Sequence, residues 1–339
     1  MQVKEIKQEY PDALFLNGGD FYQGTAYYTI LKHKVVSAVM TAMNYSHVCL
    51  GNHEFDDGPK GLAPFLDAMN ASNIAVIGTN TNFSNEPVLK DKPIHKRVTV
   101  TLQGRKIGIL GAVLPQTKEL SSPGEVVFED EIVSFKREAQ QLVQEGVNII
   151  VAITHCGYLR DVEIIRQVKE LDLVVGGHTN TFLYHGSGYP PENKVEGEYP
   201  TVVNRSDGTR GLVVQAFCYG KFLGHLQVIF DNDGNITGWS GNPILLNSSI
   251  EQDNETLNVI EPFKRNVTEK MKEPVGYTKV VLEQYNNTCR LRECNLGNLM
   301  ADAYFAYYAD MNSSSDELWS DVNGALINGG SIRAQIEQG

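Results

Sequence analysis

The stretch GNHEFDDG, residues 51–58, follows an apolar run at residues 48–50 that predicts a buried strand. Asn52 and His53 would then lie at the strand end, in the crevice where open α/β sheets bind ligands. Asn52 offers a neutral oxygen ligand for a metal, His53 a titratable proton carrier, and Asp56 a carboxylate that can orient the imidazole. The structural alternative is a helix-capping turn with a surface histidine, because Asn and Asp favour turns and caps. The other strand ends decide between these interpretations.

Polar side chains follow three more predicted strands. These are Asp20 after residues 13–16, His155 after residues 148–154, and His178 with Asn180 after residues 171–175. Each alone could be a cap or an exposed loop residue, but four such strand ends along one chain are hard to obtain by accident. Carboxylate, amide and imidazole groups together form a coordination set for two divalent metals, which Asp20 could bridge.

Residues 1–230 alternate short apolar runs with amphipathic stretches, which is the α/β pattern. Helices are predicted at residues 28–43, 61–69, 132–144 and 160–170. Further strands are predicted at residues 74–77, 97–102, 106–112, 212–217 and 225–230. Gln103, Gly104 and Arg105 separate two of these strands in the manner of a hairpin. Periodicity alone predicts an α/β fold and nothing finer.

The character of the chain changes after Asn247. Residues 248–273 are polar and contain an amphipathic run at 257–271, which predicts a helical linker between domains. A second domain would begin at Pro274, with strands at 276–282 and 325–328 and a helix at 295–311. About 65 residues cannot bury a core alone, so we expect exposed apolar surface there. The residues expected to carry that surface are Leu296, Tyr304, Phe305 and Tyr308.

Two segments of this second domain are candidate phosphate-binding groups. The Arg290 guanidinium can hold phosphate oxygens through two parallel hydrogen bonds. Asn328, Gly329 and Gly330 follow an apolar run, and the glycines would let backbone amides approach a phosphate, with Arg333 close by. The structural alternative for Asn-Gly-Gly is a strand-end turn.

Composition excludes several classes of protein. The 339 residues are 42% hydrophobic and 21% charged, which are ordinary globular values. No run approaches the ~20 apolar residues of a membrane span. The chain starts with polar MQVKEIKQEY rather than a signal peptide. A net charge of −12 and the absence of long basic clusters argue against nucleic-acid polymers and favour a small phosphate ester held by local cations.

Sequons and cysteines point to a secretory compartment. Asn-x-Ser/Thr triplets occur at Asn44, Asn70, Asn82, Asn204, Asn235, Asn247, Asn254, Asn266, Asn286 and Asn312. Cys289 and Cys294 are spaced to close a small disulfide loop, and a metal site is the weaker interpretation because no second Cys or His pair lies nearby. Cys49, Cys156 and Cys218 lie in or next to apolar strands and are expected to be buried.

Several long motifs resemble those of one family. They are GGDFYQGT (18–25), GNHEFDDG (51–58), THCGY (154–158), GGHTNTFLYHG (176–186), GNPILLNSS (241–249), CRLREC (289–294) and INGGSIRA (327–334). They resemble the calcineurin-like metallophosphoesterases, specifically animal ecto-5′-nucleotidases and arthropod apyrases. The resemblance implies a four-layer α/β/β/α sandwich at 1–247, a linker helix at 248–273 and the start of a nucleotide-binding α/β domain at 274–339.

The resemblance also implies roles for particular residues. The implied metal ligands are Asp20, Asn52, His155 and His178, with Asn180 at or beside the metal. The implied catalytic dyad is His53 with Asp56, and nucleotide binding falls to Arg290, Asn328, Gly329, Gly330 and Arg333. A disulfide between Cys289 and Cys294 is implied as well. Two divalent ions, expected to be zinc because of the His-rich set, would activate a water for attack on phosphorus.

Two departures from the family pattern lie at the chain ends. The family carries an Asp-x-His pair before the first of these motifs and two aromatic rings late in the second domain, and neither is present here. We therefore expect a fragment, with a signal peptide lost from the same end. The sequence leaves three functions open: a 5′-nucleotidase acting on nucleoside monophosphates such as AMP, an apyrase acting on ATP and ADP, or a truncated non-catalytic nucleotide-binding homologue.

The expected location is extracellular, either secreted or held at the cell surface by a lipid anchor. The expected partner is the nucleotide substrate, and a homodimer is one option for the assembly.

Overall fold

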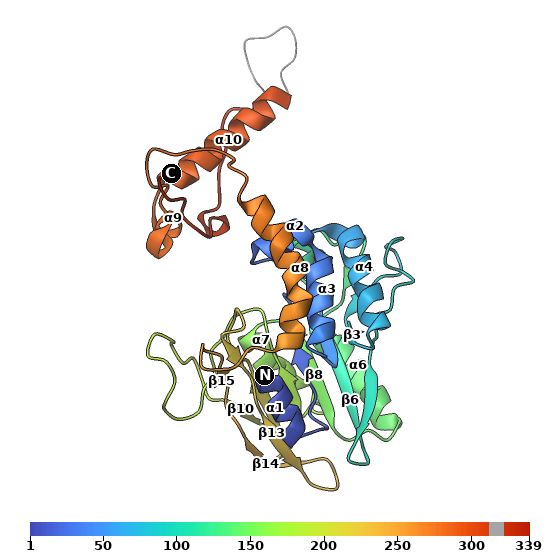
Figure 1. Ribbon diagram of the computed structural model, residues 1–339. Coiled ribbons are helices and arrows are strands. Elements are labelled where there is room, and N and C mark those ends of the chain that lie inside the picture. The colour runs from blue at the N-terminus through green and yellow to red at the C-terminus, as the bar shows by residue number, and fades with distance from the viewer. Residues whose placement is uncertain (312–321) are drawn as a thin grey trace. The chain divides into compact units, whose positions relative to one another are not determined.

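Two sheets lie at the centre of the N-terminal part of the chain in the computed structural model (Figure 1). The smaller sheet is parallel, in the order β1-β2-β3, and consists of β1 Leu16–Asn17, β2 His47–Cys49 and β3 Ala75–Ile77. The larger sheet has the order β10-β11-β9-β8-β6-β5. Its strands are β5 Val98–Leu102, β6 Arg105–Val113, β8 Ile150–His155, β9 Leu173–Val175, β10 Thr201–Asn204 and β11 Arg210–Val214.

The inner strands of the larger sheet, β6, β8, β9 and β11, run parallel, and the edge strands β5 and β10 are antiparallel to their neighbours. The tight hairpin predicted between β5 and β6 is present, with Leu102 paired to Arg105. Because parallel strands place their carboxyl ends at one edge, residues that follow β6, β8, β9 and β11 gather there.

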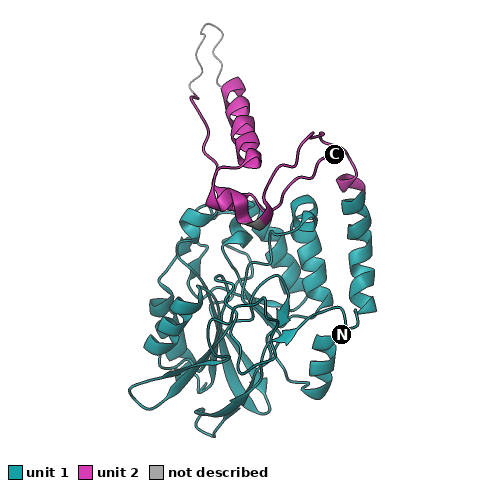
Figure 2. Cartoon of the chain, turned by 90° about the vertical axis from the view of Figure 1, so that its left-hand side faces the viewer, with its two compact units in different colours: residues 1–268 teal, residues 269–339 magenta. Residues whose placement is uncertain are grey.

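The structure describes residues 1–311 and 322–339, which form two compact units, Met1–Thr268 and Glu269–Gly339 (Figure 2). The sequon at Asn312 lies outside the described residues. Among those residues no helix is long and apolar enough to cross a membrane.

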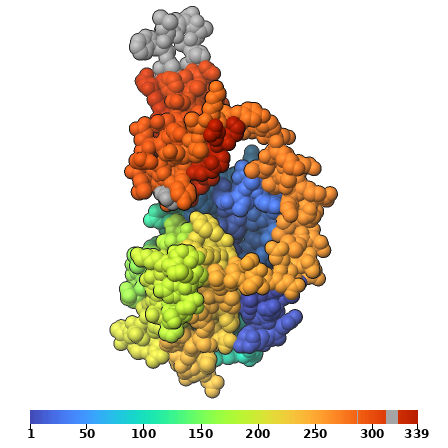
Figure 3. Space-filling view, turned by 60° about the vertical axis from the view of Figure 1, so that its left-hand side comes forward, coloured from blue at the N-terminus to red at the C-terminus, as the bar shows by residue number. Residues whose placement is uncertain are grey.

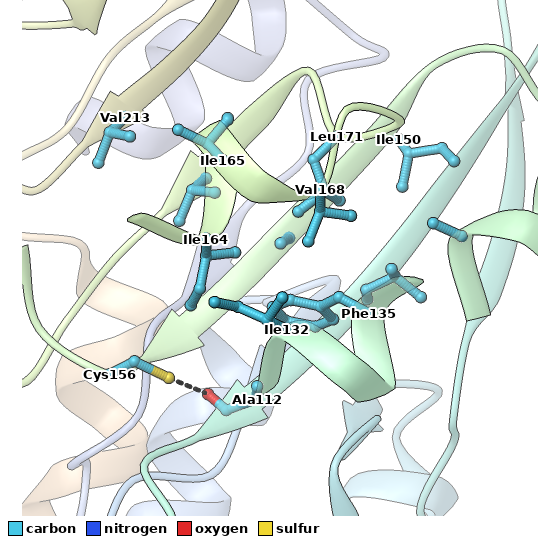
Figure 4. Packing of buried hydrophobic residues seen from close by; sticks show 14 of the residues in the cluster. Ala112, Ile132, Phe135, Ile150, Cys156, Ile164, Ile165, Val168, Leu171 and Val213 are labelled. Atoms are coloured by element: carbon cyan, nitrogen blue, oxygen red, sulfur yellow. Dashed lines mark hydrogen bonds between the residues drawn. The ribbon is translucent and has the colours of Figure 1, made fainter. Parts of the chain in front are cut away.

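Helices cover the outer face of each sheet. On the larger sheet these are α6 Glu131–Gln144 and α7 Tyr158–Gln167, and on the smaller sheet α2 Ala26–Leu31, α3 His33–Ala42 and α4 Gly58–Ala71. Phe135 of α6 and Ile164 of α7 pack with Val168, Leu171 and strand residues in one core cluster (Figure 4).

A second cluster joins α4 to β2 and β3, through Phe65, Leu66, Val48 and Val76. Between the two sheets, Cys49, Ile77, Ile109 and Ile153 form a third cluster. The order of layers is therefore α/β/β/α, and the fold expected from the sequence is confirmed.

One predicted helix is divided in two. The apolar spacing of residues 28–43 predicts a continuous helix, but α2 ends and α3 begins at Lys32, which has φ 56°. A positive φ is incompatible with α-helix continuation. At this break the Lys32 ammonium pairs with Asp57 at 2.9 Å. The spacing of apolar residues does not show the break, because both short helices contribute buried side chains, Tyr28 from α2 and Val35 from α3.

Short elements complete the first unit. They are α1 Gln2–Glu9, β4 Thr81–Asn82, α5 Thr117–Leu120, β7 Val127–Phe128, β12 Phe222–Leu223, β13 Gln227–Phe230, β14 Ile236–Ser240 and β15 Ile244–Leu245. The segment between β9 and β10, yellow-green in Figure 3, contributes exposed residues at 185–188. The amphipathic run of the predicted linker forms α8 Asn254–Met271.

The second unit contains α9 Thr288–Leu291, α10 Asn295–Met311 and two 3₁₀ turns, η2 Tyr285–Asn287 and η3 Gly329–Ser331. The strands predicted at 276–282 and 325–328 are wrong, since in the described part of this unit the only pairing is a single bridge between Leu282 and Ile336. A strand needs a neighbour along its length to satisfy its backbone groups. The two apolar segments lack such a neighbour.

Four of the five cysteines lie as the sequence suggests, and the expectation that Cys218 is buried is wrong. Cys289 and Cys294 form a disulfide with Cα atoms 5.2 Å apart. Cys49 and Cys156 are buried free thiols, and Cys218 is half-buried.

Candidate metal centre

Side chains from several strand ends converge at one edge of the two sheets. Asp20 follows β1, His155 ends β8 and His178 follows β9. One ligand atom from each of these three residues lies within 4.8 Å of the others. The rings of His155 and His178 meet edge to face with centroids 5.0 Å apart. A carboxylate and two imidazoles at such separations form a donor set for a divalent cation.

Glycines allow the strand ends to approach so closely. A Cβ atom on Gly51 would collide with Asp20 Oδ1, and one on Gly19 would lie 2.6 Å from the Gly51 nitrogen. Asp20 and His178 have φ values of 58° and 74°, in the left-handed region that non-glycine residues rarely adopt. Strained backbone of this kind persists at functional sites, where the surroundings hold it in place.

The hydrogen bonds of His155 leave its second ring nitrogen facing a carboxylate. Nδ1 lies 2.6 Å from the Gly18 carbonyl oxygen, which can only accept, so Nδ1 must donate. In the neutral ring Nε2 is then a lone-pair acceptor, 2.9 Å from Asp20 Oδ2. Two acceptor atoms at that distance repel each other unless a proton or a metal cation lies between them.

The pKa values of this pair reflect the attraction between the two side chains. Burial acts to lower the pKa of His155, but the hydrogen bond and charge of Asp20 outweigh it, and the pKa is raised. Burial acts to raise the pKa of Asp20, yet the His155 contact and the His53 amide outweigh it, and the pKa is lowered. His178 has a lowered pKa, mainly because of burial, which favours the neutral ring that ligates metals.

Asn52 contributes an unpaired oxygen. The residue is 6% exposed, and its side-chain Oδ1 is buried without a hydrogen-bond partner in the described structure. A buried amide oxygen without a partner is costly unless a cation or water binds it. The donor chemistry of Asp20, Asn52, His155 and His178 thus fits a divalent metal. Asn180 follows His178 by two residues and is exposed, with φ 54°.

His53 and Asp56 form a hydrogen-bonded pair next to these residues. His53 Nδ1 lies 2.7 Å from Asp56 Oδ2, and the His53 backbone N–H donates to Asp20 Oδ1 at 3.0 Å. Asp56 is itself held by the Ser121 hydroxyl and the Gln23 amide, each at 2.7 Å. The His53 side chain is 40% exposed, so an oriented imidazole is available to a substrate.

Residues 2–182 match the family model of the calcineurin-like phosphoesterases. The chain belongs to the calcineurin-like phosphoesterase family. Residues 274–339 match the model of the 5′-nucleotidase C-terminal domain.

Relatives of this phosphoesterase include the snake venom 5′-nucleotidase of Crotalus adamanteus, 38% identical over 99% of this chain and 57% of the relative. The apyrase of Aedes albopictus is 35% identical over 100% of this chain and 59% of the relative. A 5′-nucleotidase precursor structure from Thermus thermophilus superposes with a TM-score of 0.82 at 32% identity, over 99% of this chain and 64% of that one. The chain thus spans less than two thirds of each of these proteins.

Two buried residues of the phosphoesterase unit escaped the sequence reasoning. Glu54 is 0% exposed, and burial, followed by the charge of Asp20, raises its pKa to about 7. Gln215 follows β11, accepts the Thr181 N–H at 2.6 Å and donates to the Gly177 carbonyl at 2.9 Å, thereby bracing the loop that carries His178. Gln215 could have been found as the polar residue after the apolar run 212–214.

The predicted phosphate-binding residues lie in the second unit. Arg290 Nη2 donates to the Gly330 carbonyl at 3.5 Å, and Asn328 Oδ1 accepts the Gly330 N–H at 3.0 Å. A Cβ atom on Gly329 would collide with the Cys289 carbonyl oxygen, so only glycine fits this contact. Arg290, Asn328, Gly329 and Gly330 are therefore neighbours. Arg333 is exposed, three residues further on.

Proposed function

We propose that the protein is a metal-dependent hydrolase that releases phosphate from nucleoside 5′-monophosphates such as AMP. The observation that carries the proposal is the convergence of Asp20, His155 and His178, with the oriented imidazole of His53 beside them. Membership of the phosphoesterase family and the likeness to proteins named 5′-nucleotidase support it.

Each polar group at the centre has a proposed role. Asp20, Asn52, His155 and His178 would hold two divalent cations, with Asn180 beside them, and zinc suits an imidazole-rich set. Bound cations of this kind supply Lewis-acid stabilisation of phosphoryl charge.

The hydrogen-bonded dyad serves the reaction in another way. His53, oriented by Asp56 at 2.7 Å, would neutralise charge on the phosphoryl group or assist the leaving ribose oxygen.

The second unit would bind the nucleotide. Arg290, Asn328, Gly329, Gly330 and Arg333 are the proposed contacts. The Arg290–Gly330 hydrogen bond and the disulfide that closes the loop around Arg290 support this assignment, because both limit the conformations open to the guanidinium. A planar guanidinium suits bidentate recognition of phosphate.

Apyrase activity on ATP and ADP is the second candidate. It is favoured by the 35% identity to a protein named apyrase over the whole of this chain. The metal residues would serve either reaction, so the two differ in substrate preference and not in the proposed dyad.

The experiment is phosphate release from AMP, ADP and ATP with and without added Zn²⁺, for the wild type, His53→Ala and His185→Ala. His185 pairs with Glu198 at 2.7 Å, as His53 pairs with Asp56, and therefore serves as a matched control. We expect zinc-dependent release from AMP, reduced by a factor of ~10² or more only in His53→Ala. Release from ATP and ADP alone would favour the apyrase, and no release from any nucleotide would favour a non-catalytic binding protein.

An extracellular location is proposed as well. It is supported by the disulfide and by exposed sequon asparagines such as Asn70, Asn204 and Asn254. A mass loss on treatment of the secreted protein with an N-glycosidase would test it, and an unchanged mass would contradict it.

A further inference from the structure

Glu54 has an unusual environment for a carboxylate. It is 0% exposed and has no ion-pair partner among residues 1–311 and 322–339. Its oxygens instead accept from backbone N–H groups: Oε2 from Asp20 at 2.8 Å and Gly51 at 2.6 Å, and Oε1 from Tyr22 at 2.8 Å. A buried carboxylate is tolerated where such donors satisfy it.

These amides belong to two different strand ends. Asp20 and Tyr22 follow β1, whereas Gly51 follows β2 and directly precedes Asn52. One carboxylate therefore joins the loop that carries Asp20 to the loop that carries Asn52.

The loop after β1 also needs outside support. Asp20 has φ 58°, in the left-handed region that only a few per cent of non-glycine residues adopt. The bonds from Glu54 to the amides of Asp20 and Tyr22 lie on both sides of Phe21 and fix the turn at this point.

We propose that Glu54 is a positioning residue that sets the placement of Asp20 relative to Asn52 before a divalent cation binds. The proposal rests on the metal-dependent function proposed above. Glu54 touches neither substrate nor cation in this account, and it acts through the backbone of the ligand loops. Groups that orient metal ligands in this way typically change metal affinity by about 10–100-fold when they are removed.

The geometry predicts that only a carboxylate of this length serves. Glutamine has the same shape, but its single oxygen accepts on one side only, and its NH₂ group would face another N–H donor. Glu54→Gln therefore loses either the Tyr22 bond or the pair from Asp20 and Gly51. Aspartate keeps the charge but is one methylene shorter, so Glu54→Asp reaches the amides less well.

The test is Co²⁺ binding to the full chain, measured by calorimetry and by visible absorption, for the wild type, Glu54→Gln and Glu138→Gln. Glu138 is a matched control, because it is a buried glutamate of α6 that accepts from Arg97 at 2.6 Å and Arg137 at 3.0 Å, away from the ligand loops. We expect Glu54→Gln to bind Co²⁺ about 10–100-fold more weakly with an altered absorption band, and Glu138→Gln to bind like the wild type.

Equal Co²⁺ affinity of Glu54→Gln and the wild type would overturn the positioning role and leave the proposed metal-dependent function intact. A wild type that binds no Co²⁺ would overturn both. If Glu54→Gln fails to fold, the positioning role is tested instead by measuring backbone amide hydrogen exchange of Glu54→Asp without metal. Selective loss of protection at Asp20, Tyr22 and Gly51 supports the proposal, and unchanged protection at these amides overturns it.

Discussion

The two units bury their apolar side chains to very different extents. In Met1–Thr268 two large clusters lie between the helices and the sheets, two smaller clusters add to them, and Phe135, Leu110 and Ile164 are 0% exposed. In Glu269–Gly339 the core cluster consists of Cys294, Leu296 and Ile332 with partly buried neighbours. The expectation that Leu296 is exposed is therefore wrong, since it is 4% exposed, whereas Tyr304, Phe305 and Tyr308 are exposed as expected. Tyr277 is 86% exposed and Leu326 98%. The residues of the candidate metal centre therefore rest on a large buried core, whereas the proposed nucleotide contacts rest on a disulfide and a few side chains.

The largest expected effect is a cavity in the first unit. Phe135→Ala should lower the free energy of unfolding by about 3–5 kcal/mol, because its ring is fully buried between α6 and the larger sheet. Denaturant melts would measure it. The control is Phe305→Ala on α10, where the side chain is 39% exposed. We expect it to lower the free energy of unfolding by less than Phe135→Ala does. Equal losses would contradict the contrast between the units.

A medium effect is expected from the disulfide. Cys289→Ser with Cys294→Ser should destabilise the second unit by about 2 kcal/mol, because the short loop gains freedom in the unfolded chain. Amide exchange in α9 and α10 should accelerate, with β8 as the internal reference. Unchanged exchange in α9 and α10 would show that the small core alone holds these helices.

An effect of similar size concerns pH. Asp172 precedes β9, accepts the Ile150 N–H at 2.8 Å, and has its pKa raised to about 7 by burial. In the unfolded chain this carboxyl loses its proton near pH ~3.9. Because the pKa in the folded state is higher, the free energy of unfolding falls as pH rises from about 4 to 7. Asparagine keeps the acceptor and cannot ionise.

Asp172→Asn should therefore gain stability relative to the wild type by on the order of 2 kcal/mol between about pH 4.5 and 8. Denaturant melts at the two pH values would measure the change, and Asp12→Asn on the surface controls for the loss of one charge. A difference between Asp172→Asn and the wild type that does not change with pH would contradict the prediction.

The same contrast explains what the sequence could predict. The strand ends carrying Asp20, Asn52, His155 and His178 were predictable because apolar runs of the first unit end directly before polar side chains, and a buried sheet enforces that pattern. The break at Lys32 was not predictable, because the spacing of apolar residues carries no signal of a positive φ at this lysine. Glu54 was passed over because its role depends on amides from another loop.

In the second unit the predicted helix at residues 295–311 is confirmed, and the two predicted strands are wrong. α10 forms at the predicted residues because a helix satisfies its backbone groups within one segment. Residues 276–282 and 325–328 have apolar composition typical of strands, but a strand depends on a partner that the local sequence does not specify.

The most direct test of the account is anomalous diffraction at the zinc edge from crystals of the chain grown with Zn²⁺. We expect an anomalous peak within bonding distance of Asp20, Asn52, His155 and His178. Zinc-saturated crystals with no peak there, and with His155 still bonded only to Asp20 and Gly18, would contradict it.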